Sequence, residues 1–308
     1  MKKSVVIIIF AVLLLVPLAS AGFFDWFTGK VTQETDLAIT VGNTPPTVDF
    51  ISVTGSTIAP LENSAKLITF SVLASDHDGV NDLDDISLFV NFSSSGEATR
   101  SSIGGNCALV GDINSTTANY TCEIEMYYFD SAATWDIKGR INDSESTSAI
   151  PAQSFTFSEL TAFVISPSSL TFPGTSPGAV NVTATNDPTV LNNTGNDPIA
   201  SGSISINATD LIGETDNGFS ITAESFGVGV NSTGLFEECG TAGGTAEAVV
   251  GDVFTALSIP TLPKGNHSVN DGVTGQEELH YCLLSADAGL IKQVYSTAAA
   301  GAWTIKIA

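Results

Sequence analysis

Five carboxylates and one glycine lie close together in the stretch SDHDGVNDLDD, residues 75–85. Oxygen-bearing side chains at alternating and near-alternating positions suit calcium, which takes about six to eight oxygen ligands. Gly79 permits the tight turn that would fold these donors around one centre. The candidate ligands in this stretch are Asp76, Asp78, Asn81 and Asp82.

Two interpretations of this acidic loop are open. It lacks the final glutamate and the flanking helices of an EF-hand, so it is either a calcium loop of another type or a solvated acidic turn. Repulsion among five clustered carboxylates would splay the loop unless a cation were bound. That repulsion favours calcium as the cofactor.

Apolar runs with a period of two flank the loop and must position it. From Val48 to about Glu159, short alternating runs are separated by turn residues, and about seven such strands in about 110 residues predict a β-sandwich. In one run, Trp135, Ile137 and Ile141 share a face. The predicted strands are residues 66–75, 85–93, 120–128, 134–141 and 154–160.

An immunoglobulin-like strand order would bring a further carboxylate to the loop. Residues 66–75 and 85–93 would be strands B and C, and the NDSES stretch after Ile141 would be the F–G turn. The B–C and F–G loops emerge at the same pole of that fold, so Asp143 is a fifth candidate ligand. Asp85 begins the next strand, and we expect its carboxylate to point outward.

The second half of the chain predicts another β-sandwich. Pro167, Pro173 and Pro177 punctuate its start in the pattern of an edge strand and turn. At the end, Trp303, Ile305 and Ile307 alternate with polar residues, which predicts an inward-facing set. The predicted strands are residues 201–210, 218–226, 246–259, 278–285 and 302–308.

The N-terminus has the pattern of an export signal. Two lysines precede a long apolar run that ends in small residues, and this order predicts a secretory signal peptide over residues 1–21. An uncleaved membrane anchor is the alternative. An aromatic segment and linker follow at 22–45, and then the two expected β-sandwiches at 46–160 and 161–308.

Four cysteines agree with export to an oxidising compartment. Their positions favour sequential pairing, Cys107 with Cys122 and Cys239 with Cys282. Such bridges would stabilise the fold by about 3 and about 4 kcal/mol on loop-closure arithmetic. Glycosylation sequons are also dense, which suggests a surface glycoprotein. They begin at Asn91, Asn114, Asn119, Asn142, Asn181, Asn192, Asn207, Asn231 and Asn266.

Composition and missing motifs exclude several classes of function. With 33 acidic and 10 basic residues, the chain offers no basic patch for nucleic acid or anionic lipid. Membrane contact is expected only through the N-terminal segment, if that segment is uncleaved. The three histidines, His77, His267 and His280, fit no hydrolase, nucleotide-binding or metalloprotease motif, and we expect His280 to be a sheet residue. The chain is therefore expected not to be an enzyme.

A family resemblance rests on several stretches. NTPPTVDFISV, ASDHDGVNDLDDISLFV and MYYFDSAATWDIKGRINDSES look like the first strand, the B–C loop and the F strand of immunoglobulin-like, PKD- or cadherin-like domains. These domains occur in secreted archaeal cell-surface proteins. The second half, from ISPSSLTFPGTSPGAVNVTATN to AWTIKI, is similar to a second sandwich type of the same proteins. The resemblance implies an extracellular location and a β-sandwich fold.

The leading functional hypothesis is a non-enzymatic structural or adhesion glycoprotein of the cell surface. Its partners would be other surface subunits, including copies of itself, in a layer or filament. The alternative is a carbohydrate-binding module, in which Tyr127, Tyr128 or Phe129 would stack on the sugar rings of extracellular glycans. A secreted hydrolase is a distant third, because a catalytic triad can assemble from residues far apart in the sequence.

Overall fold

The computed structural model describes residues 36–102, 107–147, 152–230, 247–257, 261–264 and 275–307. The chain divides into two compact units, Met1–Asn43 and Thr44–Ala308. Within the described ranges, residues 36–43 form no helix or strand, and the second unit consists of strands, turns and short 3₁₀ helices. The prediction of an all-β chain is therefore confirmed. The predicted signal peptide, and residues 22–35 of the segment that follows it, lie outside the described residues.

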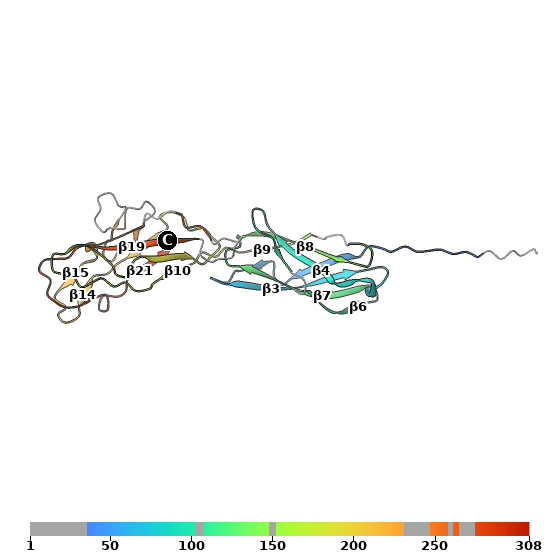
Figure 1. Cartoon of the computed structure of the whole chain (residues 1–308), viewed down its shortest axis with the longest axis horizontal. Coiled ribbons are helices and arrows are strands. Elements are labelled where there is room, and N and C mark those ends of the chain that lie inside the picture. Colours follow the sequence, from blue (N-terminus) through green and yellow to red (C-terminus); the bar gives the residue numbers. More distant parts are fainter. Residues whose placement is uncertain are drawn as a thin grey trace, which may run out of the picture. The chain divides into compact units, whose positions relative to one another are not determined.

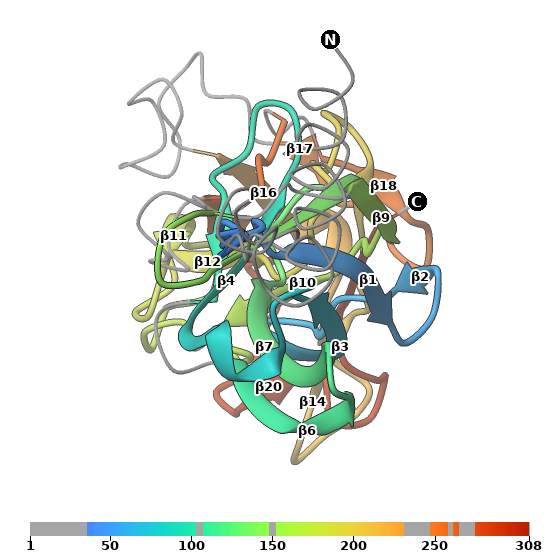
Figure 2. The same cartoon turned by 90° about the vertical axis from the view of Figure 1, so that its right-hand side faces the viewer.

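Strands β1–β9 form two sheets, which we call the first β region (Figures 1 and 2). One sheet has the order β1-β3-β7-β6 and the other β2-β9-β8-β4-β5. The bounds are β1 Thr47–Val53, β2 Thr57–Ile58, β3 Ala65–Ser75, the 3₁₀ helix η2 Val80–Asp82, β4 Asp84–Ser93, β5 Arg100–Ser101, β6 Cys107–Asn114, β7 Thr117–Tyr127, β8 Ala133–Asn142 and β9 Ala152–Phe157.

Alternating side chains from both sheets form a single hydrophobic core in this region. β3 pairs with β7 along its whole length, from Ala65 opposite Tyr127 to Ser75 opposite Thr117. Apolar side chains on one face of β3, β4, β7 and β8 are buried, and those of both sheets pack into a single cluster that includes Trp135, Tyr120 and Phe92. Burial of such large side chains stabilises the region by about 1.5–3 kcal/mol each.

The sequence prediction found the long strands of the first β region and missed β6. The five predicted runs correspond to β3, β4, β7, β8 and β9, with ends shifted by a few residues. β6 was missed because it is an edge strand on which Leu109, Val110 and Ile113 are all substantially exposed, so its apolar residues do not alternate. Irregular pairing with β7 between Leu109 and Gly111 further breaks the pattern.

Strands β10–β21 form the second β region, which contains three sheets. Their orders are β10-β12-β19-β16-β17 with β11 also on β19, β18-β13-β21, and β15-β14-β20. The bounds are β10 Phe163–Ser166, β11 Val180–Thr183, β12 Thr189–Asn193, β13 Ile204–Asn207, β14 Leu211–Gly213, β15 Ser220–Ile221, the 3₁₀ helix η3 Ala223–Ser225, β16 Phe226–Val230, β17 Glu247–Ala248, β18 Thr255–Ala256, β19 Gln276–Ser285, β20 Tyr295–Ser296 and β21 Thr304–Ile307.

Predictions for the second β region were less complete. β19 and β21 lie where strands were expected, and β10 is an edge strand as the proline pattern predicted. In contrast, residues 246–259 contain only the two-residue strands β17 and β18 within their described part. β12 was missed because it buries polar Thr189 and Asn193 beside Leu191, which hides the apolar period.

One predicted disulfide is confirmed. A bond joins Cys107 of β6 to Cys122 of β7, which lie opposite each other in the sheet. Cys282 is buried in β19, but its predicted partner Cys239 lies outside the described residues. That second pairing stays a prediction.

The sequon asparagines differ in exposure. Asn114 and Asn181 are exposed, whereas Asn91, Asn119, Asn142, Asn192 and Asn207 are half-buried on strands. Asn231 and Asn266 lie outside the described residues. Glycosylation stays a prediction, and among the described sequons Asn114 and Asn181 offer the most accessible side chains.

Candidate metal centre

The acidic loop joins β3 to β4 and is held against the turn between β6 and β7. The amide of Asp76 donates to the carbonyl of Thr116 at 2.9 Å, and the amide of Val80 donates to the carbonyl of Ser115 at 3.1 Å. Gly79 has a φ of 114°, a conformation that residues with a Cβ rarely adopt. The turn that was expected at this glycine is therefore present.

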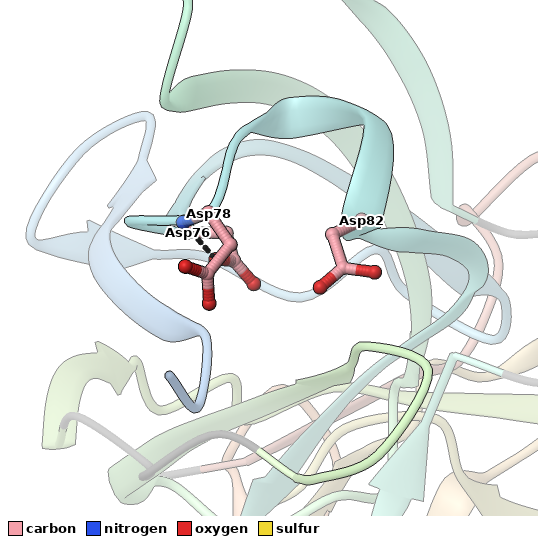
Figure 3. A group of neighbouring side chains, drawn as sticks. All are labelled: Asp76, Asp78 and Asp82. Carbon is pink, nitrogen blue, oxygen red and sulfur yellow. Dashed lines mark hydrogen bonds between the residues drawn. The ribbon is translucent and has the colours of Figure 1, made fainter. Parts of the chain in front are cut away.

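Three carboxylates of the loop converge. Asp76, Asp78 and Asp82 each offer an oxygen that lies within 4.8 Å of the other two. Figure 3 shows Asp76 and Asp78 side by side, with Asp82 facing them from the end of η2. Asp82 is half-buried and Asp78 is exposed, so the group lies at the surface with Asp76 at its base.

Asp76 is the buried member of this group. The residue is only 1% exposed, and its Oδ1 accepts a hydrogen bond from the amide of Asp78 at 2.7 Å. Its Oδ2 is also buried, and within the part of the chain that the structure describes it has no hydrogen-bond partner. A buried, unsatisfied carboxylate oxygen is costly, since it loses its hydration without replacement.

The charges around Asp76 also disfavour its ionised form. Burial raises the pKa of Asp76 above 3.8, and the negative charges of Asp78, Asp82 and Asp143 raise it further, while the hydrogen bond from the Asp78 amide lowers it. A positive charge placed among these carboxylates would offset both the burial and the repulsion. A pocket of about 270 Å³, lined by Asp49, His77 and others, adjoins Asp76.

The NDSES stretch at the end of β8 contacts the acidic loop, as expected. The hydroxyl of Ser144 donates to Asp82 Oδ1 at 3.1 Å. Asp143 is close enough to influence Asp76, but its own carboxylate accepts hydrogen bonds within its turn, from the amide of Glu145 at 2.7 Å and the hydroxyl of Ser146 at 2.6 Å. Asp143 is therefore not in the converging group, and its role as a ligand stays a prediction.

Two hydrogen bonds at the loop, one to Asp85 and one to Asp78, were not expected from the sequence. The expectation that Asp85 points outward was wrong: its Oδ1 accepts a hydrogen bond at 2.6 Å from the hydroxyl of buried Tyr120. Sequence reasoning also missed Thr44, whose amide donates to Asp78 Oδ2 at 2.6 Å. Asn81 lies exposed within η2 beside Asp82, and its role as a ligand stays a prediction.

The aromatic cluster after β7 packs internally. Tyr128 and Phe129 are 5% and 0% exposed, so neither presents a face to a sugar ring. Tyr127 is half-buried, stacks on Phe129, and has the guanidinium of Arg100 4.6 Å from its ring centre. Tyr128 and Phe129 therefore offer no platform for a sugar ring, and the carbohydrate-binding alternative stays a prediction.

His280 lies on β19, as expected of a sheet residue. Its Nδ1 is 3.4 Å from Asp187 Oδ2, and its Nε2 is 3.7 Å from the exposed carboxylate of Glu278. His77 is exposed beside the acidic loop, and His267 lies outside the described residues.

The convergence of Asp76, Asp78 and Asp82 suits a hard divalent cation better than acid–base chemistry, because all three donors are oxygens of one charge sign. Within the described ranges, no helix has the length and hydropathy needed to cross a bilayer. No family model matches the chain, and no curated protein matches its sequence. Function is therefore argued from the residues and their geometry.

Proposed function

We propose that the chain is a non-enzymatic structural or adhesion subunit of the cell surface that associates with copies of itself. It would be exported, glycosylated and disulfide-bonded, and would contain two β-sandwich domains. Asn114 and Asn181 would be the first sequons to carry glycans, because they are the exposed ones among those described.

Strand order supports an immunoglobulin-like identity for the first β region. Taking β1, β3, β4, β6, β7, β8 and β9 as strands A to G, one sheet has the order A-B-E-D and the other contains G-F-C. Those are the two sheets of the constant-type immunoglobulin fold. The Cys107–Cys122 bond ties edge strand β6 to the sheet, which suits an oxidising extracellular setting.

The observation that carries self-association is a segment that precedes the first β region. Leu37, Ile39 and Val41 alternate with small or polar residues in the pattern of a strand, yet they are 84%, 80% and 83% exposed. A segment with this pattern can add to an open sheet edge of a neighbouring protein, which buries its apolar side chains and satisfies its backbone. A second copy of the chain would supply such an edge.

Light scattering on the size-fractionated exported protein tests the proposal. We expect species larger than a monomer that grow with protein concentration. Replacing Leu37, Ile39 and Val41 together by serine should weaken association at least tenfold, because the segment would lose its apolar face. Thermal unfolding should be unchanged, since these side chains are exposed.

A matched control replaces Leu67, Ile86 and Val180 by serine, which removes the same three residue types from exposed positions on strands. This control should associate like the wild type. A monomer at every concentration would overturn the proposal, and so would an equal loss of association in both variants.

A further inference from the structure

We infer that Asp76, Asp78 and Asp82 bind one calcium ion, with Asp76 Oδ2 as the innermost ligand. The inference is independent of self-association, so failure of one leaves the other standing. It rests on two observations together: the convergence of three carboxylates, and a buried carboxylate oxygen that has no hydrogen-bond partner among the described residues.

The spacing of the oxygens fits one shared ion. Calcium binds oxygens at about 2.3–2.6 Å, so two ligands on opposite sides of the ion are about 5 Å apart. One carboxylate oxygen from each of the three residues lies within 4.8 Å of the other two. A single cation between them would therefore contact all three with little movement of the loop.

The burial of Asp76 argues that the site is built rather than accidental. Surface acidic clusters commonly point into water, where their charges are screened. Here the loop holds Asp76 at 1% exposure. One of its oxygens accepts from the Asp78 amide, and the other is buried without a donor from any described residue. A bound cation would supply the missing partner of Oδ2.

Surrounding contacts support calcium over magnesium. Asp78 comes from a loop position and is exposed, so water can complete the coordination shell on that side. Calcium tolerates irregular shells of about six to eight oxygens, whereas magnesium requires a near-ideal octahedron at about 2.0–2.1 Å. A shallow, partly solvated site with three carboxylates can provide the irregular oxygen shell that calcium tolerates.

The same site would also hold the chain at its entry into β1. Because the Thr44 amide donates to Asp78 Oδ2, an ion that fixes Asp78 would fix the hydrogen-bond acceptor of this amide as well. Calcium should therefore slow hydrogen exchange in a peptide that covers Thr44. This readout does not depend on the heat of binding.

Calorimetric titration of the chelator-treated exported protein with calcium chloride tests the inference. We expect one saturable site, with a Kd near the range of about 0.1–1 mM seen in extracellular modules, and weaker binding of magnesium. Asp76→Asn should raise the Kd at least tenfold, because the amide replaces the innermost charged ligand. Asp78→Asn should also weaken binding, and this variant should still fold because Asp78 is exposed.

Asp49→Asn is the matched control. Asp49 lines the pocket beside Asp76 but is outside the converging group, so its loss changes the local charge equally without removing a ligand. Its Kd should stay within about twofold of the wild type. The inference is overturned by the absence of saturable binding up to about 10 mM calcium, or by equal weakening in Asp49→Asn and Asp78→Asn, which would indicate only diffuse attraction of counter-ions.

Discussion

Two carboxylates, one in each β region, are buried in different ways. Asp187 of the second region has a side chain that is 4% exposed, and both of its oxygens accept from the amide of Tyr281 at 3.1 Å. His280 lies 3.4 Å away on the same strand as Tyr281. Asp76 of the first region is also buried, but it is surrounded by like charges, and one of its oxygens has no hydrogen-bond partner among the described residues.

The comparison shows that the protein's own groups compensate the buried carboxylate of Asp187 more fully than that of Asp76. Burial raises the pKa of both residues, but the Tyr281 amide and His280 act to lower that of Asp187. Around Asp76, the hydrogen bond from the Asp78 amide lowers the pKa, but the charges of three neighbouring carboxylates raise it. We therefore expect the second region to be stable without added ions and the first region to depend on a cation.

The largest expected effect is on the first region when calcium is withdrawn. Binding to the folded state alone would stabilise it by about 2.7 kcal/mol at a hundredfold excess over the Kd. Hydrogen exchange in peptides from β3 and β7 should accelerate on addition of a chelator, while peptides from β19 should be unaffected. Equal responses in both regions, or none in the first, would break the comparison.

Removal of Asp187 should produce the next largest effect, in the second region and independently of calcium. Asp187→Ala leaves the buried Tyr281 amide without its acceptor, which should cost about 1–3 kcal/mol. Chemical denaturation followed by exchange in β19 measures this loss. Glu278→Ala is the control, because that exposed carboxylate should contribute less than about 1 kcal/mol.

A smaller effect is expected from pH on the second region. The folded-state pKa of Asp187 is raised above its ordinary value of 3.8, so the folded state takes up a proton first as the pH falls. Its contribution to stability should therefore increase as pH falls through the raised pKa, by at most about 1.4 kcal/mol per pH unit, and level off near the unfolded value. Denaturation midpoints across this window should lose that component in Asp187→Asn; an identical profile would contradict the assignment.

The smallest effect concerns the contact between the F–G turn and the acidic loop. Ser144→Ala removes an exposed hydroxyl that donates to Asp82 Oδ1 at 3.1 Å. Because such a bond contributes about 0.5–1 kcal/mol, the Kd for calcium should rise about two- to fivefold. An unchanged Kd would mean that the turn does not help to position Asp82.

Sequence patterns predicted the frame of the candidate site better than its contacts. The period of two in Cys122, Ile124 and Met126 identified a half-buried strand, and the strand order then placed the F–G turn near the loop. Regular alternation is visible in a sequence because each strand has one buried face. The same logic failed for β12, where Thr189 and Asn193 are buried.

The individual contacts depend on tertiary packing that no local pattern records. A spacing of alternate aspartates cannot show that Asp76 becomes the buried one, or that the amide of Thr44 reaches Asp78. The position of Asp85 at the start of a strand does not show that the hydroxyl of buried Tyr120 needs a hydrogen-bond acceptor there. The outward orientation expected for Asp85 was wrong for this reason.

A crystal structure of the exported protein grown with calcium, with an anomalous difference map, tests the central claim most directly. The account predicts one peak within about 2.3–2.6 Å of Asp76 Oδ2, also coordinated by Asp78 and Asp82. The peak should disappear in crystals of Asp76→Asn. A well-ordered loop at millimolar calcium with no peak, and with Asp76 Oδ2 bonded to water or to another carboxyl group, would contradict it.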